Sequence, residues 1–230
     1  MRAFLLTFKN QNRDMPIFKK TAYILSIICL TMSCNLALSQ NSETKHAIND
    51  TTFVNLKYYS SNFVYDMKYS TEDNFLKAKV YNCAECFLRL KTVKALINAN
   101  EAFMKKGYKI KLYDCYRPLD IQKRMWTIVS NPKYVADPKK GSIHNRGGAV
   151  DISLVDADGK ELDMGTSFDF FGPEAAHGYE NLSDEVKSNR KMLRKIMQRN
   201  DFKTFESEWW HYNLKNSGKD KLSNEKWKCD

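Results

Sequence analysis

Helical spacing of apolar side chains and helix-start signals predict three helices. The first covers residues 88–106, where apolar residues recur every three or four positions, and it ends at Gly107. The second covers residues 119–129. The third covers residues 183–200, because Ser183 is a good N-cap and acidic residues occupy the first turn after it.

Three other segments predict strands. Residues 109–113 alternate between polar and apolar, residues 149–155 are almost continuously apolar, and residues 205–212 are rich in aromatic side chains. Helices and strands are intermixed without a strict β-α-β alternation, which indicates the α+β class. We expect a single compact domain with a central antiparallel sheet flanked by helices.

The N-terminal segment resembles a secretory signal. Lys19 and Lys20 precede an apolar run from Thr21 to Met32, which is shorter than the roughly 20 residues of a membrane-spanning helix. Small residues follow, so we expect residues 1–39 to be cleaved off and the protein to be exported to the periplasm. Two alternatives remain: a lipoprotein signal that leaves Cys34 lipidated, and an uncleaved anchor.

The charge is more modest once the signal is removed. The whole chain carries a formal net charge of +10, and residues 1–39 hold five basic residues and one acidic residue, so +6 remains. Both signs are spread along the rest of the chain, without an arginine-rich run that is interleaved with aromatics. We therefore expect no nucleic-acid partner. With a mean hydropathy of -0.57 and one apolar run, we also expect no membrane span.

The remaining sequence divides into a polar lead-in at 40–59, a catalytic domain at 60–215 and a polar tail at 216–230. Four cysteines remain in this part of the chain: Cys83, Cys86, Cys115 and Cys229. In an exported protein they favour structural disulfides, although free thiols, or a metal or redox pair at the first two, are alternatives. The connectivity stays open, and one bond could fasten the tail.

Two segments carry candidate chemistry. In the first, His144 lies in a glycine-containing loop and Asp151 lies in an apolar strand, where an unpaired carboxylate is costly. In the second, Glu208 and His211 flank two tryptophans. Two imidazoles and one carboxylate are a normal ligand set of a catalytic zinc ion, and Glu208 would then act as the base on a water molecule.

Each segment also has a simpler explanation. Asp151 could pair with an arginine or a lysine instead of a metal. In addition, positions 208 and 211 face opposite sides of a regular strand, so Glu208 and His211 converge only if a bulge or a strand end intervenes.

The motifs together resemble the D-alanyl-D-alanine dipeptidase family of zinc peptidases. The strongest pair is Ser142-x-His144-x-x-Gly147-x-Ala149-x-Asp151 followed by Glu208-x-x-His211. Three further segments are similar to family elements: Asp66 to Phe75, Asp114-x-x-Arg117-Pro118, and Asp163 to Phe170. The resemblance covers roughly residues 60–215 and implies an α+β fold with zinc in a central cleft. The cysteines depart from the family pattern.

The resemblance implies a role for each matching residue. One Zn²⁺ per chain is expected on His144, Asp151 and His211, with Glu208 as the catalytic base. Arg117 is expected to stabilise the oxyanion, and the alternative is that it only pairs with Asp114.

Three further positions match residues that bind substrate: Tyr69, Ser142 and Asp169, of which the last is expected to face the ammonium group of the dipeptide D-Ala-D-Ala. Two alternatives remain for the function. One is a D,D-carboxypeptidase or peptidoglycan endopeptidase that uses the same site, and the other is a non-catalytic binding module stabilised by zinc.

Overall fold

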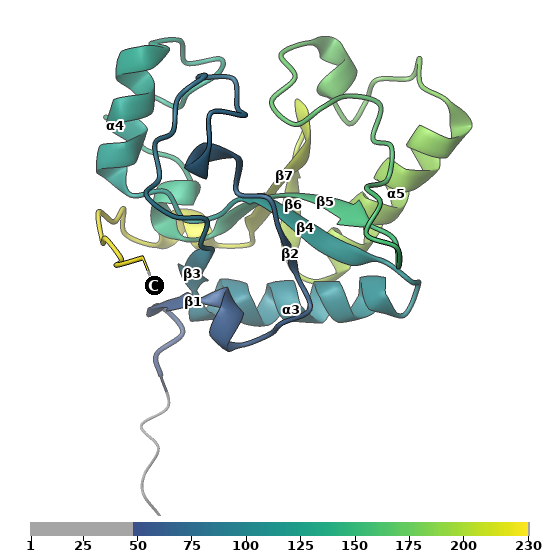
Figure 1. Ribbon diagram of the computed structural model, residues 1–230, viewed down its shortest axis with the longest axis horizontal. Coiled ribbons are helices and arrows are strands. Elements are labelled where there is room, and N and C mark those ends of the chain that lie inside the picture. Colours follow the sequence, from purple (N-terminus) through teal and green to yellow (C-terminus); the bar gives the residue numbers. More distant parts are fainter. Residues whose placement is uncertain (1–47, 230) are drawn as a thin grey trace, which may run out of the picture. The chain divides into compact units, whose positions relative to one another are not determined.

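A five-stranded sheet forms the centre of the protein. The computed structural model describes residues 48–229, so the expected signal peptide and the alternative lipidation site at Cys34 lie outside the described part. The strands are hydrogen-bonded in the order β2, β4, β5, β7 and β6, and Figure 1 labels each of them. Their bounds are Val64–Tyr65 (β2), Lys109–Asp114 (β4), Ala149–Val155 (β5), Phe202–Phe205 (β6) and Glu208–Leu214 (β7).

The expected all-antiparallel sheet is wrong at one edge. Strand β2 pairs with β4 in parallel, with Val64 opposite Lys111, whereas the other three pairs are antiparallel. The chain between β2 and β4 contains a long helix, and a crossover of this kind lets two strands run in the same direction. The sheet is therefore mixed, within an α+β fold.

The three predicted helices are present. They are α3 (Leu90–Met104), α4 (Leu119–Ile128) and α5 (Asp184–Arg199). The Ser183 side chain accepts a hydrogen bond from the Val186 amide, as an N-cap does. No helix between residues 48 and 229 has the length and apolar character needed to cross a membrane.

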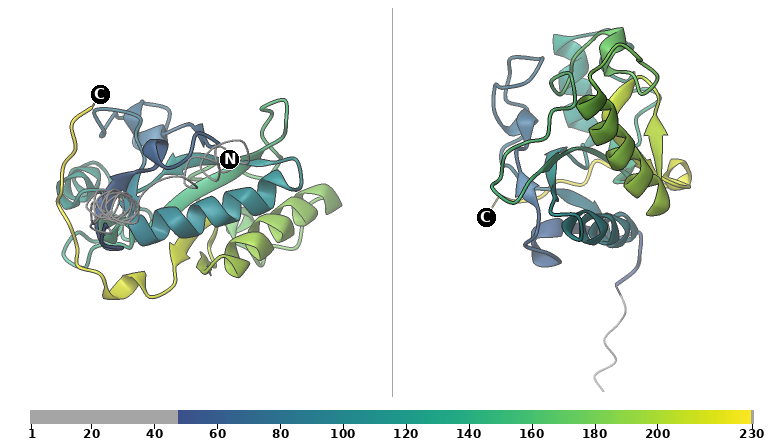
Figure 2. Two further views of the ribbon diagram at one scale, coloured as in Figure 1. Left: turned by 90° about the horizontal axis from the view of Figure 1, so that it is seen from below. Right: turned by 90° about the vertical axis from the view of Figure 1, so that its right-hand side faces the viewer.

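Helices α3 and α5 pack side by side against one face of the sheet (Figure 2). On β5, Val150, Ile152 and Leu154 belong to this core. Because successive side chains of a strand alternate between faces, Asp151 points to the opposite face of the sheet. A second apolar cluster involves α4 and includes Tyr69, Met125 and Val135. The face of β5 that lies away from α3 and α5 is therefore available for polar chemistry.

The expected single strand at 205–212 is two strands of a hairpin. Strand β6 ends at Phe205, residues 206–207 form the turn, and β7 begins at Glu208. The turn has the sequence Glu-Ser, without the glycine, proline or asparagine that usually marks a turn. The aromatic run across it therefore has the appearance of one continuous strand.

The expected lead-in at 40–59 is too long. Strand β1 (Phe53–Asn55) pairs antiparallel with β3 (Phe87–Arg89), and Leu56 is completely buried. Ordered packing of the domain thus begins before residue 60. A three-residue strand is too short to give a periodic signal in the sequence.

The tail at 216–230 is polar, as expected, but it is fastened to the domain. A disulfide joins Cys83 to Cys229, and the Trp227 ring stacks on Phe87 with centroids 4.7 Å apart. The other two cysteines, Cys86 and Cys115, form a second disulfide. The prediction of structural disulfides is confirmed.

Candidate active site

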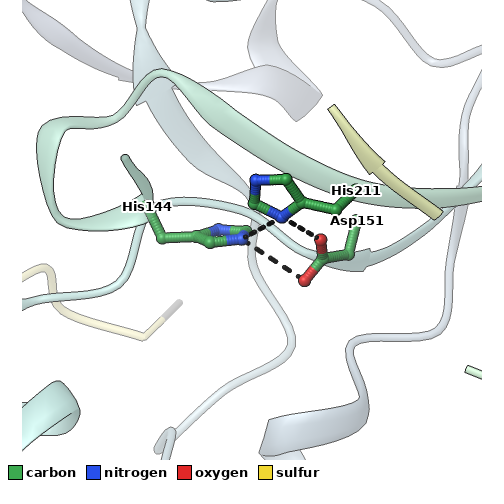
Figure 3. Close-up of side chains that lie close together, drawn as sticks. All are labelled: His144, Asp151 and His211. Atoms are coloured by element: carbon green, nitrogen blue, oxygen red, sulfur yellow. Dashed lines mark hydrogen bonds and ion pairs between the residues drawn. The ribbon is translucent and has the colours of Figure 1, made fainter. Parts of the chain in front are cut away.

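The site begins where β5 and β7 stop pairing. The ladder between them covers Ala149–Asp151 and His211–Asn213, and Asp151 is directly opposite His211 at its end. The Oδ1 atom of Asp151 lies 2.9 Å from Nδ1 of His211 (Figure 3). Strand β5 continues to Val155, but beyond Asp151 it pairs only with β4 among the strands of this sheet. The sheet therefore opens at these two side chains.

His144 reaches the same point from a short 3-10 turn, His144–Arg146, which precedes β5. The turn ends at Gly147, whose backbone φ is +68°. A Cβ atom there would lie 2.3 Å from the Phe53 ring, so only glycine fits. The Nε2 atom of His144 is 3.2 Å from Nδ1 of His211 and 3.4 Å from Oδ2 of Asp151. One ligand atom from each of the three residues lies within 4.8 Å of the others.

In each histidine, the ring nitrogen that points away from Asp151 donates a hydrogen bond to an oxygen atom. Nδ1 of His144 donates to the Cys115 carbonyl oxygen at 2.6 Å, and Nε2 of His211 donates to Oδ1 of Asn213 at 2.9 Å. Such contacts fix the tautomer of a metal-binding histidine. They leave His144 Nε2 and His211 Nδ1 as the inner atoms that face the Asp151 carboxylate.

The inner atoms need a positive charge between them. Two imidazole lone pairs and a carboxylate repel one another at these distances unless a proton or a metal cation separates them. Burial lowers the pKa of His211, but Asp151 more than offsets this and raises it overall. Burial alone would raise the pKa of Asp151, and the two histidines reverse the shift. Two nitrogens and one oxygen fit a zinc ion with one position left for water.

Glu208 and His211 converge because the register of the hairpin shifts. Thr204 is opposite Tyr212, but the next residue, Phe205, is opposite Glu208. The irregularity that convergence requires is therefore present, and both side chains line one pocket of about 300 Å³. Burial raises the pKa of the Glu208 carboxyl above its usual value of 4.5. A raised pKa suits a group that takes up and releases a proton near neutral pH.

Arg117 is buried and paired with Asp114. Its Nη2 and Nε atoms donate to Oδ2 of Asp114 at 2.6 and 3.2 Å, and Nη1 donates to Gln122 at 3.0 Å. Burial alone would lower the pKa of the guanidinium, but Asp114 raises it, so the arginine stays charged. The Tyr81 hydroxyl donates to the other oxygen of Asp114 at 2.8 Å. The guanidinium has more N–H groups than these three bonds use.

The predicted substrate-binding residues also border the pocket. The Tyr69 hydroxyl donates to Oδ2 of Asp169 at 2.9 Å, and burial raises the pKa of that carboxyl, with Asp151 adding to the effect. The Ser142 amide and hydroxyl both donate to Asn145, so this serine also stabilises the turn that carries His144. The structure brings all eight predicted site residues to this pocket: Tyr69, Arg117, Ser142, His144, Asp151, Asp169, Glu208 and His211.

Two polar residues of the site were not assigned a catalytic, metal-binding or substrate-binding role from the sequence, although Asp114 was expected as a possible partner of Arg117. Asn213 could have been found, because it lies two positions after His211 and therefore on the same face of β7. Asp114 stands inside the Asp-x-x-Arg-Pro motif, but its position depends on a register shift between Leu112 and Asp114. That shift sets Asp114 opposite Asp151 and has no signal in the sequence.

The chain is similar in sequence to known D-alanyl-D-alanine dipeptidases. A D-alanyl-D-alanine dipeptidase of Escherichia coli is 33% identical over 184 residues, which cover 79% of this chain and 95% of the relative. A D-alanyl-D-alanine dipeptidase of Enterococcus faecium is 30% identical over 175 residues, covering 66% and 85%. One of Enterococcus faecalis is 29% identical over 171 residues, covering 65% and 85%.

The sequence pattern of a peptidase family, described as D-ala-D-ala dipeptidase, matches residues 49–228. This span includes every residue of the site pocket. It also includes three of the four disulfide-bonded cysteines, since Cys229 lies one residue beyond it. The chain therefore belongs to peptidase family M15, the D-Ala-D-Ala dipeptidases, and is a metallopeptidase.

Proposed function

We propose that this protein hydrolyses the dipeptide D-Ala-D-Ala to two D-alanines with one zinc ion per chain. The observation that carries the proposal is the meeting of His144, Asp151 and His211 in one pocket with Glu208. The names of the relatives supply the substrate class.

Each residue of the site has a separate role in peptide hydrolysis. When bound, zinc supplies a Lewis acid and lowers the pKa of a water molecule toward about 7. Glu208 accepts a proton from the attacking water and returns it to the departing amine nitrogen. Arg117 directs its remaining N–H groups at the oxygen that becomes negative. Tyr69 holds Asp169, whose carboxylate receives the ammonium group of the substrate.

The size of the pocket favours a dipeptide. Its volume of about 300 Å³ is at the lower end of the range for small-molecule sites. At its border the Phe171 ring contacts Tyr134 and Phe75, with centroids 4.1 and 4.8 Å apart. These rings connect three separate loops and limit the room for a longer peptide.

The test is a metal analysis of the purified protein together with turnover of two substrates. We expect one zinc per chain and faster hydrolysis of D-Ala-D-Ala than of an N-blocked tripeptide that ends in D-Ala-D-Ala. A preference for the blocked tripeptide would identify a D,D-carboxypeptidase instead. Zinc without hydrolysis of either substrate would identify a binding module.

We also propose that the protein is exported and works in cell-wall peptide turnover, recycling D-alanine. Two disulfides support an oxidising compartment. Cell fractionation tests this: the protein should be in the periplasmic fraction, or with membranes if Cys34 is lipidated. Recovery from the cytosol would contradict export and favour a role in reducing the targets of glycopeptide antibiotics.

A further inference from the structure

The charged groups of the site pocket are unequal in number. Apart from the two histidines, the pocket is lined by three carboxylates and two basic residues. The carboxylates belong to Asp151, Asp169 and Glu208, and the basic residues are Arg117 and Lys133. A free dipeptide is a zwitterion, so its recognition calls for a cation at the carboxylate end as well as an anion at the ammonium end.

Arg117 is poorly suited to bind the C-terminal carboxylate of the dipeptide. Its charge is already balanced by Asp114, which is fully buried, and two of its nitrogens donate to the same oxygen of that residue. A third nitrogen is engaged by Gln122. An arginine whose positive charge is balanced by a neighbouring carboxylate can still donate hydrogen bonds, but it adds little net attraction for a second anion.

Lys133 is the other cation, and its charge is not balanced. Its side chain is exposed, and within residues 48–229 its ammonium forms no ion pair or hydrogen bond with another side chain. Other lysines of this domain are paired with a carboxylate, as in Lys68–Asp73 and Lys91–Asp220, both at 2.7 Å. The ammonium of Lys133 therefore keeps its donors for a ligand.

The backbone of Lys133 is fixed at the pocket border. Oδ1 of Asn131 accepts from the Lys133 amide at 3.0 Å, and the Asn131 carbonyl accepts from the amides of Tyr134 and Val135 at 2.9 Å. Val135 is 1% exposed and belongs to the second apolar cluster. Tyr134, which directly follows Lys133, packs on Phe171. The flexible part of this lysine thus begins at a rigid turn that forms part of the pocket wall.

We propose that the Lys133 ammonium binds the C-terminal carboxylate of the substrate and so makes the site selective for a free carboxyl end. This inference rests on the proposed dipeptidase function. It assigns Lys133 to specificity, since the ammonium would contact a part of the substrate that does not react. Its loss should weaken binding while the chemical step stays intact.

The experiment compares D-Ala-D-Ala with its C-terminal amide, which lacks the negative charge. In the zinc-loaded protein, Lys133→Ala should raise KM for D-Ala-D-Ala about fivefold, the effect of losing one partly exposed charge pair. It should leave kcat nearly unchanged and should leave KM for the amide within about twofold. Lys133→Arg should retain most of the affinity. Lys140→Ala removes an exposed lysine of the same loop that does not line the pocket, and it should change neither KM.

A second measurement separates this inference from the proposed function. Calorimetry on the zinc-loaded Glu208→Ala variant measures binding of the two ligands without hydrolysis. Adding Lys133→Ala should weaken binding of D-Ala-D-Ala and not of the amide. If the wild-type protein fails to hydrolyse D-Ala-D-Ala, the proposed function fails, and the binding comparison still decides the role of Lys133. Equal losses for both ligands, no loss for the dipeptide, or no binding at all would overturn the inference.

Discussion

Asp151 and His211 are 60 residues apart in the sequence and directly opposite each other in the sheet, with Oδ1 and Nδ1 2.9 Å apart. They occupy the last paired positions of β5 and β7. His144 completes the cluster from the turn that precedes β5. Residues of two strands and a loop would hold a metal there, so metal affinity and the stability of the fold would be linked.

Removal of the metal should therefore destabilise the protein. With free zinc at 1,000 times its dissociation constant, binding adds about 4 kcal/mol to the free energy of unfolding. A chelator should remove this contribution, and Asp151→Ala should make stability insensitive to zinc. Urea unfolding with and without chelator measures both effects. Asp158→Ala, in the exposed turn after β5, is the control and should respond to zinc as the wild type does.

Glu208→Ala should retain zinc and lose hydrolysis. Glu208 is not part of the three-residue ligand cluster, whereas loss of a general base lowers turnover by about 10²–10⁴. Metal content and D-Ala-D-Ala turnover are measured on the same preparation. Glu206→Ala changes an exposed carboxylate two residues away and should keep full activity. Undiminished turnover in Glu208→Ala would exclude it as the base.

Asp114 should contribute far more to stability than an exposed acid in a similar pair. The Asp114–Arg117 and Asp73–Lys68 pairs have nearly equal distances, 2.6 and 2.7 Å, but the first is buried and the Asp73 side chain is 77% exposed. Asp114→Ala leaves a buried guanidinium without its partner and should lower the free energy of unfolding by about 3–5 kcal/mol. Asp73→Ala should cost at most about 1 kcal/mol. Equal losses in urea unfolding would contradict this account.

The stability should fall on acidification partly because of His177. This residue lies beside Tyr212, outside the site pocket, and burial lowers its pKa from 6.5 to about 4, with Arg194 adding to the shift. As the pH falls from 6.5 to 4, the unfolded chain binds a proton here that the folded chain does not bind, so stability is lost over this window. The loss should be about 2 kcal/mol.

Urea unfolding at pH 7 and at pH 4.5 tests the role of His177. The His177→Gln variant should lose less stability between the two values than the wild type, because it cannot bind the proton. A pH dependence identical to that of the wild type would show that other groups are responsible.

The two disulfides should differ in their effect on zinc. The carbonyl oxygen of Cys115 accepts from Nδ1 of His144, so the Cys86–Cys115 bond braces the strand end that orients a metal ligand. Replacing both cysteines by serine should cost about 3–4 kcal/mol of stability, as expected for a closed loop of this length, and should weaken zinc binding. Replacing Cys83 and Cys229 should lower stability and leave zinc affinity unchanged. Competition with a chromophoric chelator measures the affinity.

Much of the fold follows from local patterns in the sequence. Apolar spacing located α3, the apolar run at residues 149–155 located β5, and Ser183 marked the start of α5. Family motifs then selected the eight residues that line the pocket.

The remaining features depend on contacts between distant segments. The convergence of Glu208 and His211 depends on a register shift between β6 and β7, and the placement of Asp114 depends on another between β4 and β5. Such shifts are set by packing across the sheet and have no signal in one strand alone. The parallel edge strand β2, only two residues long, was missed for a related reason.

The fastened tail imposes an order on oxidative folding. Cys86 and its partner Cys115 are separated by 29 residues, whereas Cys83 and Cys229 are separated by 146. Because the chain is synthesised from its N-terminus, Cys229 is the last of the four cysteines to appear. Until then Cys83, three residues from Cys86, has no native partner and stays a free thiol. Cys115 is within reach of either thiol during that interval. Correct assembly therefore depends on thiol–disulfide exchange that continues until Cys229 arrives, and the yield of native protein should be sensitive to the isomerase activity of its compartment.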